Sequence, residues 1–278
     1  MTTHYPKNFG AMLHAFMFNW KPGAETVDFQ HMDRRVDPIT GRQKTMHGEW
    51  QPCWSLTELI GKAQSWPITD NYISVQRFTA WSKMEGSVRS DHSAYVLDRI
   101  YTDTDPEAGE GDCLHLLPRY RRMQEALSVD GKTAVWLICS GRGFHTYTYL
   151  DRPITVAEGR ELQNILGYVF DLELDYHVPI TRARMMRLPY SKNSRTNTWV
   201  LSVGQNMSLR GLRNAMKSEL LDGCHWENPA RVTPEKIWNL HPGTKILDEY
   251  QEQKRAKARA ALAKKRESFA VKQSDSVV

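Results

Sequence analysis

The hydrophobic and polar positions in the middle of this chain predict β-strands. Runs of bulky, aromatic and β-branched residues are bounded there by glycine-rich and polar turns, a pattern typical of strands joined by short loops. The extended segments are 72–81, 95–105, 133–140, 145–150, 182–190 and 199–203. Residues 1–54 mix apolar clusters with turn signals, and their pattern gives no clear order of elements.

Capping residues and helical spacing predict helices between and after these strands. Ser55 and Glu58 form a capping box, and the helix that they open ends at about Trp66. Thr155 and Glu158 form a second capping box, before a helix whose apolar residues share one face. The remaining helical signals are a short segment near 119–127, the spacing of positions 209, 212, 216 and 220, and Thr233 before Pro234.

This order of elements predicts an α+β fold with a mixed sheet and helices toward the C-terminus. At 278 residues the chain is long enough to bury a sizeable core. We divide it into a main domain, 1–205, a helical annex, 206–250, and a basic tail, 251–278.

The formal net charge of +5 lies wholly in the tail. Three acidic residues accompany eight basic ones there, namely Lys254, Arg255, Lys257, Arg259, Lys264, Lys265, Arg266 and Lys272. Residues 1–250 are formally neutral, so a basic groove in the body must come from the arrangement of its charges. Because the tail lacks an apolar face, it is either a solvated helix or a mobile segment. We expect a mobile arm that tethers nucleic acid or docks a partner.

The cysteines and the apolar runs argue against a secreted or membrane-spanning protein. Four cysteines lie far apart without a CxxC pair, which is typical of reduced thiols in an intracellular, cytoplasmic protein. No apolar run approaches the roughly 18 residues that span a bilayer. Cys113 and His115 with His92 are the one candidate zinc set, and we expect no structural zinc.

The first candidate site lies at the end of the strand predicted over 95–105. Side chains two apart in a strand share a face, so Asp103 and Asp105 project together. Two close carboxylates repel unless a cation neutralises them, and hard oxygen ligands suit Mg²⁺ or Mn²⁺. A DxD is not specific, since glycosyltransferases carry one and a solvated turn explains it as well.

The second and third candidates are a glycine turn and a cationic stripe. In the turn 140–145, Ser140, Arg142, Gly143 and His145 combine flexible backbone with donors that suit a triphosphate. An ordinary hairpin is the alternative. The stripe comprises Asp175, a third candidate metal ligand, the phosphate-binding candidates Arg182, Arg184 and Arg187, and the following segment through Ser191 to Arg195 and Thr196. A solvated face is its alternative.

In this order, the three segments resemble the archaeo-eukaryotic primase (primase-polymerase) superfamily. Members carry a DxD, then an SGxGxH-type turn, then a carboxylate before an (R/K)xPxS element. The matching residues are Asp103 with Asp105, the turn 140–145, and Asp175 with the segment 187–191. The lead-in 96–101 is also similar. The resemblance covers about residues 72–200 and is specific only as an ordered triple.

The resemblance implies a palm-like fold related to RNA-recognition modules and a DNA primase or polymerase activity. Asp103, Asp105 and Asp175 would be catalytic and hold two Mg²⁺ or Mn²⁺ ions. The implied nucleotide-binding residues are Ser140, Arg142, Gly143, His145, Arg187 and Ser191. The implied partners are a single-stranded DNA template and NTPs or dNTPs, with a replicative helicase or another replication protein as a further candidate.

Two departures and two rival functions accompany this resemblance. The zinc-bearing insertion of many members is absent between the first two motifs, and Asn193 stands where some members have a histidine. One rival is a metal-dependent nuclease or phosphohydrolase, which needs clustered carboxylates and a water-activating base. The other is a non-catalytic single-strand-binding replication accessory protein in which Asp103 and Asp105 are vestigial.

Overall fold

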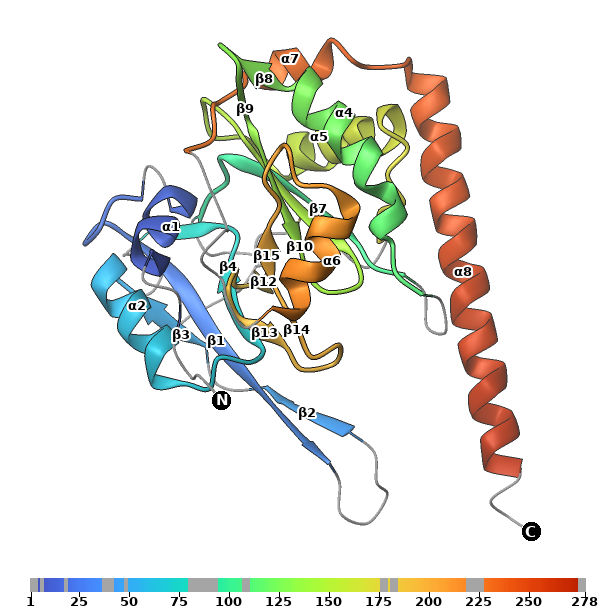
Figure 1. The fold of residues 1–278 in the computed structure, drawn as a ribbon. Helices are drawn as coiled ribbons and strands as arrows, with labels where there is room; N and C mark the ends of the chain where they lie inside the picture. The colour runs from blue at the N-terminus through green and yellow to red at the C-terminus, as the bar shows by residue number, and fades with distance from the viewer. Residues whose placement is uncertain are drawn as a thin grey trace.

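A computed structural model describes residues 5, 8–17, 20–36, 43–47, 50–79, 95–106, 111–175, 180, 185–218 and 228–274. Within these ranges the chain has an α+β fold, as predicted, with two sheets at its centre and helices around them (Figure 1). The helices are α1 Phe9–Phe16, α2 Leu56–Ser65, the 3₁₀ turn η1 Leu114–Leu116, α4 Leu117–Ala126, α5 Val156–Val169, α6 Leu209–Lys217, α7 Pro234–Trp238 and α8 Thr244–Ser274.

The smaller of the two central sheets has four strands in the order β15-β10-β11-β7. Its strands are β7 Arg99–Thr104, β10 Val135–Cys139, β11 Phe144–Tyr149 and β15 Leu201–Ser202. Strand β11 turns back between β7 and β10 and pairs antiparallel with both. All residues of the three long strands are buried, which agrees with their aromatic and β-branched composition.

The larger central sheet is built around β1 in the order β12-β4-β1-β5-β6, with β2 and β3 also paired to β1. Its strands are β1 Glu25–Val36, β2 Gln43–His47, β3 Gln51–Cys53, β4 Asn71–Ser74, β5 Arg77–Thr79, β6 Tyr95–Val96 and β12 Met185–Arg187. Two short ladders complete the sheet structure, β8 Ser128–Val129 with β9 Lys132–Thr133 and β13 Lys192–Asn193 with β14 Thr198–Trp199.

The expected mixed sheet differs from the pairing found. Every ladder between the named strands is antiparallel, and parallel pairing occurs in the described ranges only as isolated bridges such as Thr69 with Lys192. The segments 72–81 and 95–105 each form two strands instead of one.

Strand β1 is the main element that the sequence pattern misses. Val27 and Phe29 lie in the core, but the polar residues Asp28 and Gln30 that follow each of them are buried as well. The amide of Asp28 donates to the hydroxyl of Ser74, 2.9 Å away and 46 residues along the chain. A hydrogen-bond partner so distant in the sequence satisfies a buried polar group of the strand but leaves no signal in the neighbouring residues.

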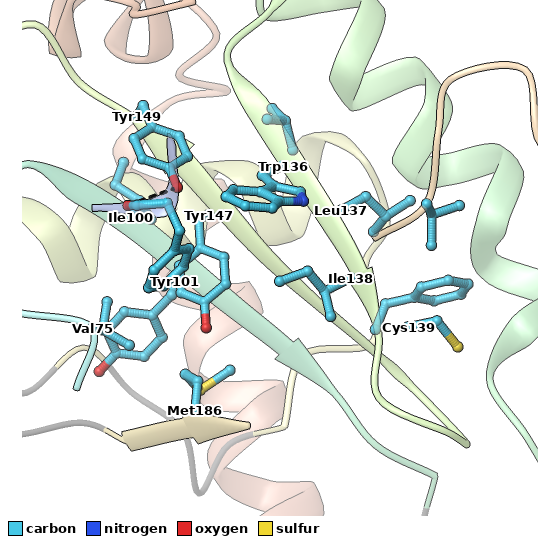
Figure 2. Close-up of a cluster of buried hydrophobic side chains, with 14 of the residues drawn as sticks. Val75, Ile100, Tyr101, Trp136, Leu137, Ile138, Cys139, Tyr147, Tyr149 and Met186 are labelled. Atoms are coloured by element: carbon cyan, nitrogen blue, oxygen red, sulfur yellow. Dashed lines mark hydrogen bonds between the residues drawn. The ribbon is translucent and has the colours of Figure 1, made fainter. Parts of the chain in front are cut away.

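One hydrophobic core holds the two sheets together. Figure 2 shows side chains of β7, β10 and β11 in one cluster with Val75 and Met186, which belong to the region of the larger sheet. Leu212 and Met216 of α6, Ile237 of α7 and Leu247 of α8 join the same core.

The predicted capping residues open the helices. Thr155 and Glu158 form both bonds of a capping box at α5. At α2 the hydroxyl of Ser55 accepts from the amide of Glu58, while the Glu58 carboxylate accepts from Trp54, one residue earlier than a capping box requires.

Helix α8 crosses the predicted boundary between residues 250 and 251 without a break (Figure 1). The three-part division and the mobility of the tail stay predictions. None of the helices in the described ranges is long and apolar enough to span a membrane.

Candidate active site

The first motif lies at the end of β7, directly opposite the second. Antiparallel pairing of β7 with β11 sets Asp103 across from His145 and Thr104 across from Phe144. Both Asp103 and His145 are buried, and Nε2 of His145 lies 3.1 Å from Oδ1 of Asp103. The strand end is fixed from behind by a hydrogen bond between the hydroxyls of Thr104 and Tyr120.

Asp105 follows the last residue of β7 and brings a second carboxylate to the same place. It is solvent-accessible, yet the atoms around its carboxyl group remove enough water to raise its pKa, and the negative charge of Asp103 raises it further. The positive charges of His145, Arg142 and Arg187 act on Asp105 in the opposite direction. Side chains from three separate elements therefore act electrostatically on Asp105.

The glycine turn 140–143 joins β10 to β11 and lies against the end of β7. A Cβ atom at Gly143 would come within 1.7 Å of the Thr104 carbonyl oxygen and 2.9 Å of Oδ1 of Asp105. A glycine is therefore needed for the turn to approach the carboxylates so closely. Gly141 has φ +120°, and a Cβ there would meet the hydroxyl of Thr196 at 2.7 Å.

The polar groups of this turn have different partners. The hydroxyl of Ser140 lies 3.4 Å from the Gly143 carbonyl oxygen, so its donor points back into the turn. Arg142 is half-buried, and no described residue hydrogen-bonds its guanidinium group. Nδ1 of His145 is buried and has no hydrogen-bond partner among the described residues. Arg142 and this ring nitrogen are the groups of the turn left for a ligand.

Arg187 of β12 comes to the site from the larger sheet, and Asp70 holds it there. Nη1 of Arg187 donates to Oδ1 of Asp70, and the guanidinium carbon lies 5.0 Å above the ring centroid of Tyr72. Asp70 is buried and adopts φ +51°. The sequence analysis did not single out Asp70 or Tyr72. Asp70 falls in a polar turn before the strand predicted over 72–81, where an aspartate is unremarkable.

Asn193 links the cationic stripe to the glycine turn. Its Nδ2 donates to the carbonyl oxygen of Ser140 at 2.7 Å, and its Oδ1 accepts from the amide of Arg195 at 3.1 Å. The hydroxyl of Ser191 donates to the carbonyl oxygen of Leu188 at 2.6 Å and closes a turn. Ser191 therefore shapes this segment in the structure, while its contact with a nucleotide stays a prediction.

Asp175 joins the first motif through its backbone. Its amide donates to the carbonyl oxygen of Asp103 at 2.8 Å, and the residue is half-buried. The backbone of Asp175 therefore lies beside that of Asp103, and a metal-binding role of its side chain stays a prediction. Arg182, Arg184 and His92 lie outside the described residues.

The donor set at the end of β7 fits a hard divalent cation in its chemistry. Oδ1 of Asp103 is buried and lies 3.1 Å from Nε2 of His145, and the negative charge of Asp103 contributes to the raised pKa of Asp105 after burial of that carboxyl group. Carboxylate oxygens are the ligands that Mg²⁺ and Mn²⁺ prefer. Nowhere in the described part of the chain do three His, Cys, Asp or Glu side chains already form a metal-binding group.

No protein-family model matches the chain, and no curated protein matches it either. Solved structures are similar to it. The AEP domain of the cyanophage S-2L primase-polymerase is 13% identical, with a TM-score of 0.49 over 86% of this chain and 99% of that chain. The likeness is to primases and polymerases.

Two further solved structures are similar to this chain. The polymerase domain of Mycobacterium tuberculosis Ligase D, solved in complex with DNA, is 15% identical at a TM-score of 0.44, over 83% of this chain and 84% of that one. The catalytic domain of primase Repb′, in complex with initiator DNA, is 12% identical at a TM-score of 0.42, over 89% and 99%. At such identities and TM-scores, residue roles and activity rest on the contacts described above.

Proposed function

We propose that this chain is a template-directed nucleotidyl transferase that synthesises primers on single-stranded DNA from NTPs or dNTPs. One observation carries the proposal. A repelling carboxylate pair, Asp103 and Asp105, lies within electrostatic reach of Arg142, His145 and Arg187, which come from two different sheets. An acidic centre for cations beside a cationic centre for phosphates is what phosphoryl transfer from a triphosphate needs.

The acidic centre is the proposed metal site. Asp103, Asp105 and Asp175 would hold Mg²⁺ or Mn²⁺, and two ions are expected. The bound cations would neutralise the carboxylates and the negative charge that develops on the transferred phosphoryl group. Since the amide of Asp175 is bonded to the backbone of Asp103, a shift of the first motif would also move the third carboxylate.

The cationic centre is the proposed triphosphate site. Arg142 supplies a guanidinium group without a hydrogen-bond partner among the described residues, and the glycines beside it let backbone amides come close to an anion. Arg187 supplies a second guanidinium group, kept in one position by Asp70 and Tyr72. A fixed cation loses little conformational freedom when it binds a phosphate, which favours tight and oriented binding.

The arrangement favours synthesis over the two rival functions. A nuclease has no use for a separate triphosphate site. It does need a general base that activates water, and the best candidate for that base, His145, faces Asp103 through Nε2. A non-catalytic binding protein has no need for an acidic pair, because carboxylates repel a phosphate backbone.

Incorporation of a labelled nucleotide on a single-stranded template tests the proposal. The full chain is incubated with Mg²⁺ or Mn²⁺, with and without a primer, and in parallel with a chelator. We expect a template-dependent product that disappears with the chelator. Shortening of the template would instead support the nuclease, and binding without either reaction would support the accessory protein.

A further inference from the structure

The first turns of α8 are anchored on the end of α5. Leu247 is buried, and the rings of Tyr250 and Tyr168 meet edge to face with centroids 5.7 Å apart. A Cβ atom at Gly167 would come within 2.6 Å of the Tyr250 hydroxyl. These contacts fix both the position and the rotation of α8 about its axis.

Lys254 follows Tyr250 by one helical turn, on the side of α8 that packs on the end of α5. Its ammonium group lies 5.4 Å from the ring centroid of Tyr250. Burial lowers the pKa of Lys254, and the negative charge of Asp175 opposes this shift. Lys254 is thus within electrostatic reach of Asp175, whose amide is bonded to Asp103. In Figure 1, β7 points toward α8, which continues past the body toward the C-terminus.

The tail's basic residues segregate by type around α8. At 100° per residue, all five lysine positions fall in a stripe about 100° wide that includes Lys254. The members of this lysine stripe are Lys254, Lys257, Lys264, Lys265 and Lys272. The arginine positions, Arg255, Arg259 and Arg266, lie together on another side of the helix, next to Glu252.

The arginine side and the lysine side of α8 differ in their ion pairs. Arg255 lies 3.6 Å from the Glu252 carboxylate, and Arg259 pairs with the same group. Lys257 is exposed and has no ion pair among the described residues. Residues 254–272 extend for about 27 Å at 1.5 Å per residue. The stripe is therefore an elongated row of lysine positions whose first member, Lys254, lies within electrostatic reach of Asp175.

We propose that the lysine stripe of α8 binds the phosphate backbone of single-stranded DNA next to the active site. The occupant follows from charge complementarity, because lysine positions that recur along one side of a helix match a polyanion. The choice of DNA rests on the proposed function. In this proposal DNA binds to one side of α8. A mobile tether would instead bind DNA through its lysines and arginines alike.

Two triple variants with equal loss of charge separate these possibilities. One is Lys257→Gln with Lys264→Gln and Lys265→Gln, and the other is Arg255→Gln with Arg259→Gln and Arg266→Gln. Glutamine retains helix propensity, and circular dichroism checks that α8 persists. Affinity for a labelled oligodeoxythymidine is measured by fluorescence anisotropy at several salt concentrations, without nucleotide or divalent cation.

We expect the lysine variant to bind more weakly and to lower the salt slope by about 2, since each lost single-strand contact removes about 0.7. The arginine variant should change the slope much less. Equal losses in both variants would overturn the stripe in favour of a non-directional tether, and an unchanged slope in the lysine variant would overturn binding by α8.

The outcome is independent of the activity assay. Incorporation without a lysine effect would refute the stripe and leave the proposed function intact. A lysine effect without incorporation would keep the binding surface and refute the polymerase.

Discussion

The two ends of strand β7 differ in how the charges of their acidic side chains are balanced. At its start, Asp98 accepts from Arg77 at 2.8 Å and from Arg99 at 3.2 Å, and Glu25 lies 3.4 Å from Arg77. These side chains are all buried, and the guanidinium group of Arg99 also lies 4.9 Å from the ring centroid of Tyr149. Arg231 acts on the same group of side chains, so both carboxylates there are balanced by arginines without help from a ligand.

At its end, β7 places two carboxylates where repulsion between them persists. Burial raises the pKa of Asp105 and the negative charge of Asp103 raises it further, while Oδ1 of Asp103 is buried with Nε2 of His145 3.1 Å away. The paired charges at the start of β7 are typical of a cluster that stabilises the fold. The carboxylates at its end are typical of a site that binds a ligand. The two therefore differ in what a substitution should damage, namely stability or activity.

The largest effect on stability is expected at the start of the strand. Asp98→Asn leaves Arg77 and Arg99 buried with only Glu25 to balance them. Breaking a buried ion pair costs about 3–5 kcal/mol, so the free energy of unfolding should fall by that amount. Urea denaturation followed by tryptophan fluorescence measures it. Asp130→Asn, in an exposed turn, is the matched control. A stable Asp98→Asn protein would contradict the structural role of this cluster.

Loss of the free guanidinium group in the glycine turn should mainly affect nucleotide use. Arg142→Gln removes a charge-assisted contact worth about 1.5–3 kcal/mol, so kcat/KM for the nucleotide should fall about 10- to 100-fold. Template affinity should stay nearly unchanged. Arg152→Gln is the control, because Arg152 is exposed and pairs with Glu235. Equal losses in template affinity would show that Arg142 contacts DNA instead.

A smaller effect is expected when the support of Arg187 is removed. Asp70→Asn suits the left-handed backbone but deprives Arg187 of its counter-ion. The KM for nucleotide should rise less than in Arg187→Gln. The double variant should resemble Arg187→Gln alone, because both changes act on the same contact. Additive effects would show that Asp70 does not act through Arg187.

The smallest effect is a change of stability with pH at Asp105. Its folded-state pKa is raised, so the folded protein binds this proton more tightly than the unfolded chain, and stability falls as pH rises from the ordinary value of 3.8 through the folded pKa. Asp105→Asn should therefore stabilise the metal-free protein at neutral pH, with a gain that fades below this window. Thermal unfolding in a chelating buffer measures it. A destabilised variant at neutral pH would contradict repulsion from Asp103.

The sequence identifies the elements of the site more readily than its contacts. The order of the three motifs and the strand spacing of Asp103 and Asp105 are local features, and in the structure Asp103 pairs with His145 across the sheet while the backbone of Asp175 is bonded to that of Asp103. The capping boxes are local as well, which explains why α5 begins where predicted. The strands of the smaller sheet could be predicted because aromatic and β-branched residues dominate them.

What the sequence could not reveal depends on distant partners. Asp70 meets Arg187 across 117 residues, and Asn193 meets Ser140 across 53. The hydroxyl of Ser140 looks like a ligand donor in the sequence, yet it points back into its own turn. Strand β1 escapes notice for the same reason, since Asp28 is satisfied from β4.

The most direct test of the account is nucleotide incorporation by two aspartate variants and one control. Asp103→Asn and Asp105→Asn remove one charge each from the end of β7, and Asp130→Asn makes the same chemical change in a distant turn. We predict that the first two lose incorporation by at least about 100-fold with either Mg²⁺ or Mn²⁺, while the control keeps it. Folding of each variant is checked by circular dichroism. A folded Asp103→Asn or Asp105→Asn protein with incorporation near that of the unaltered chain would contradict the proposal that this carboxylate pair is the catalytic centre.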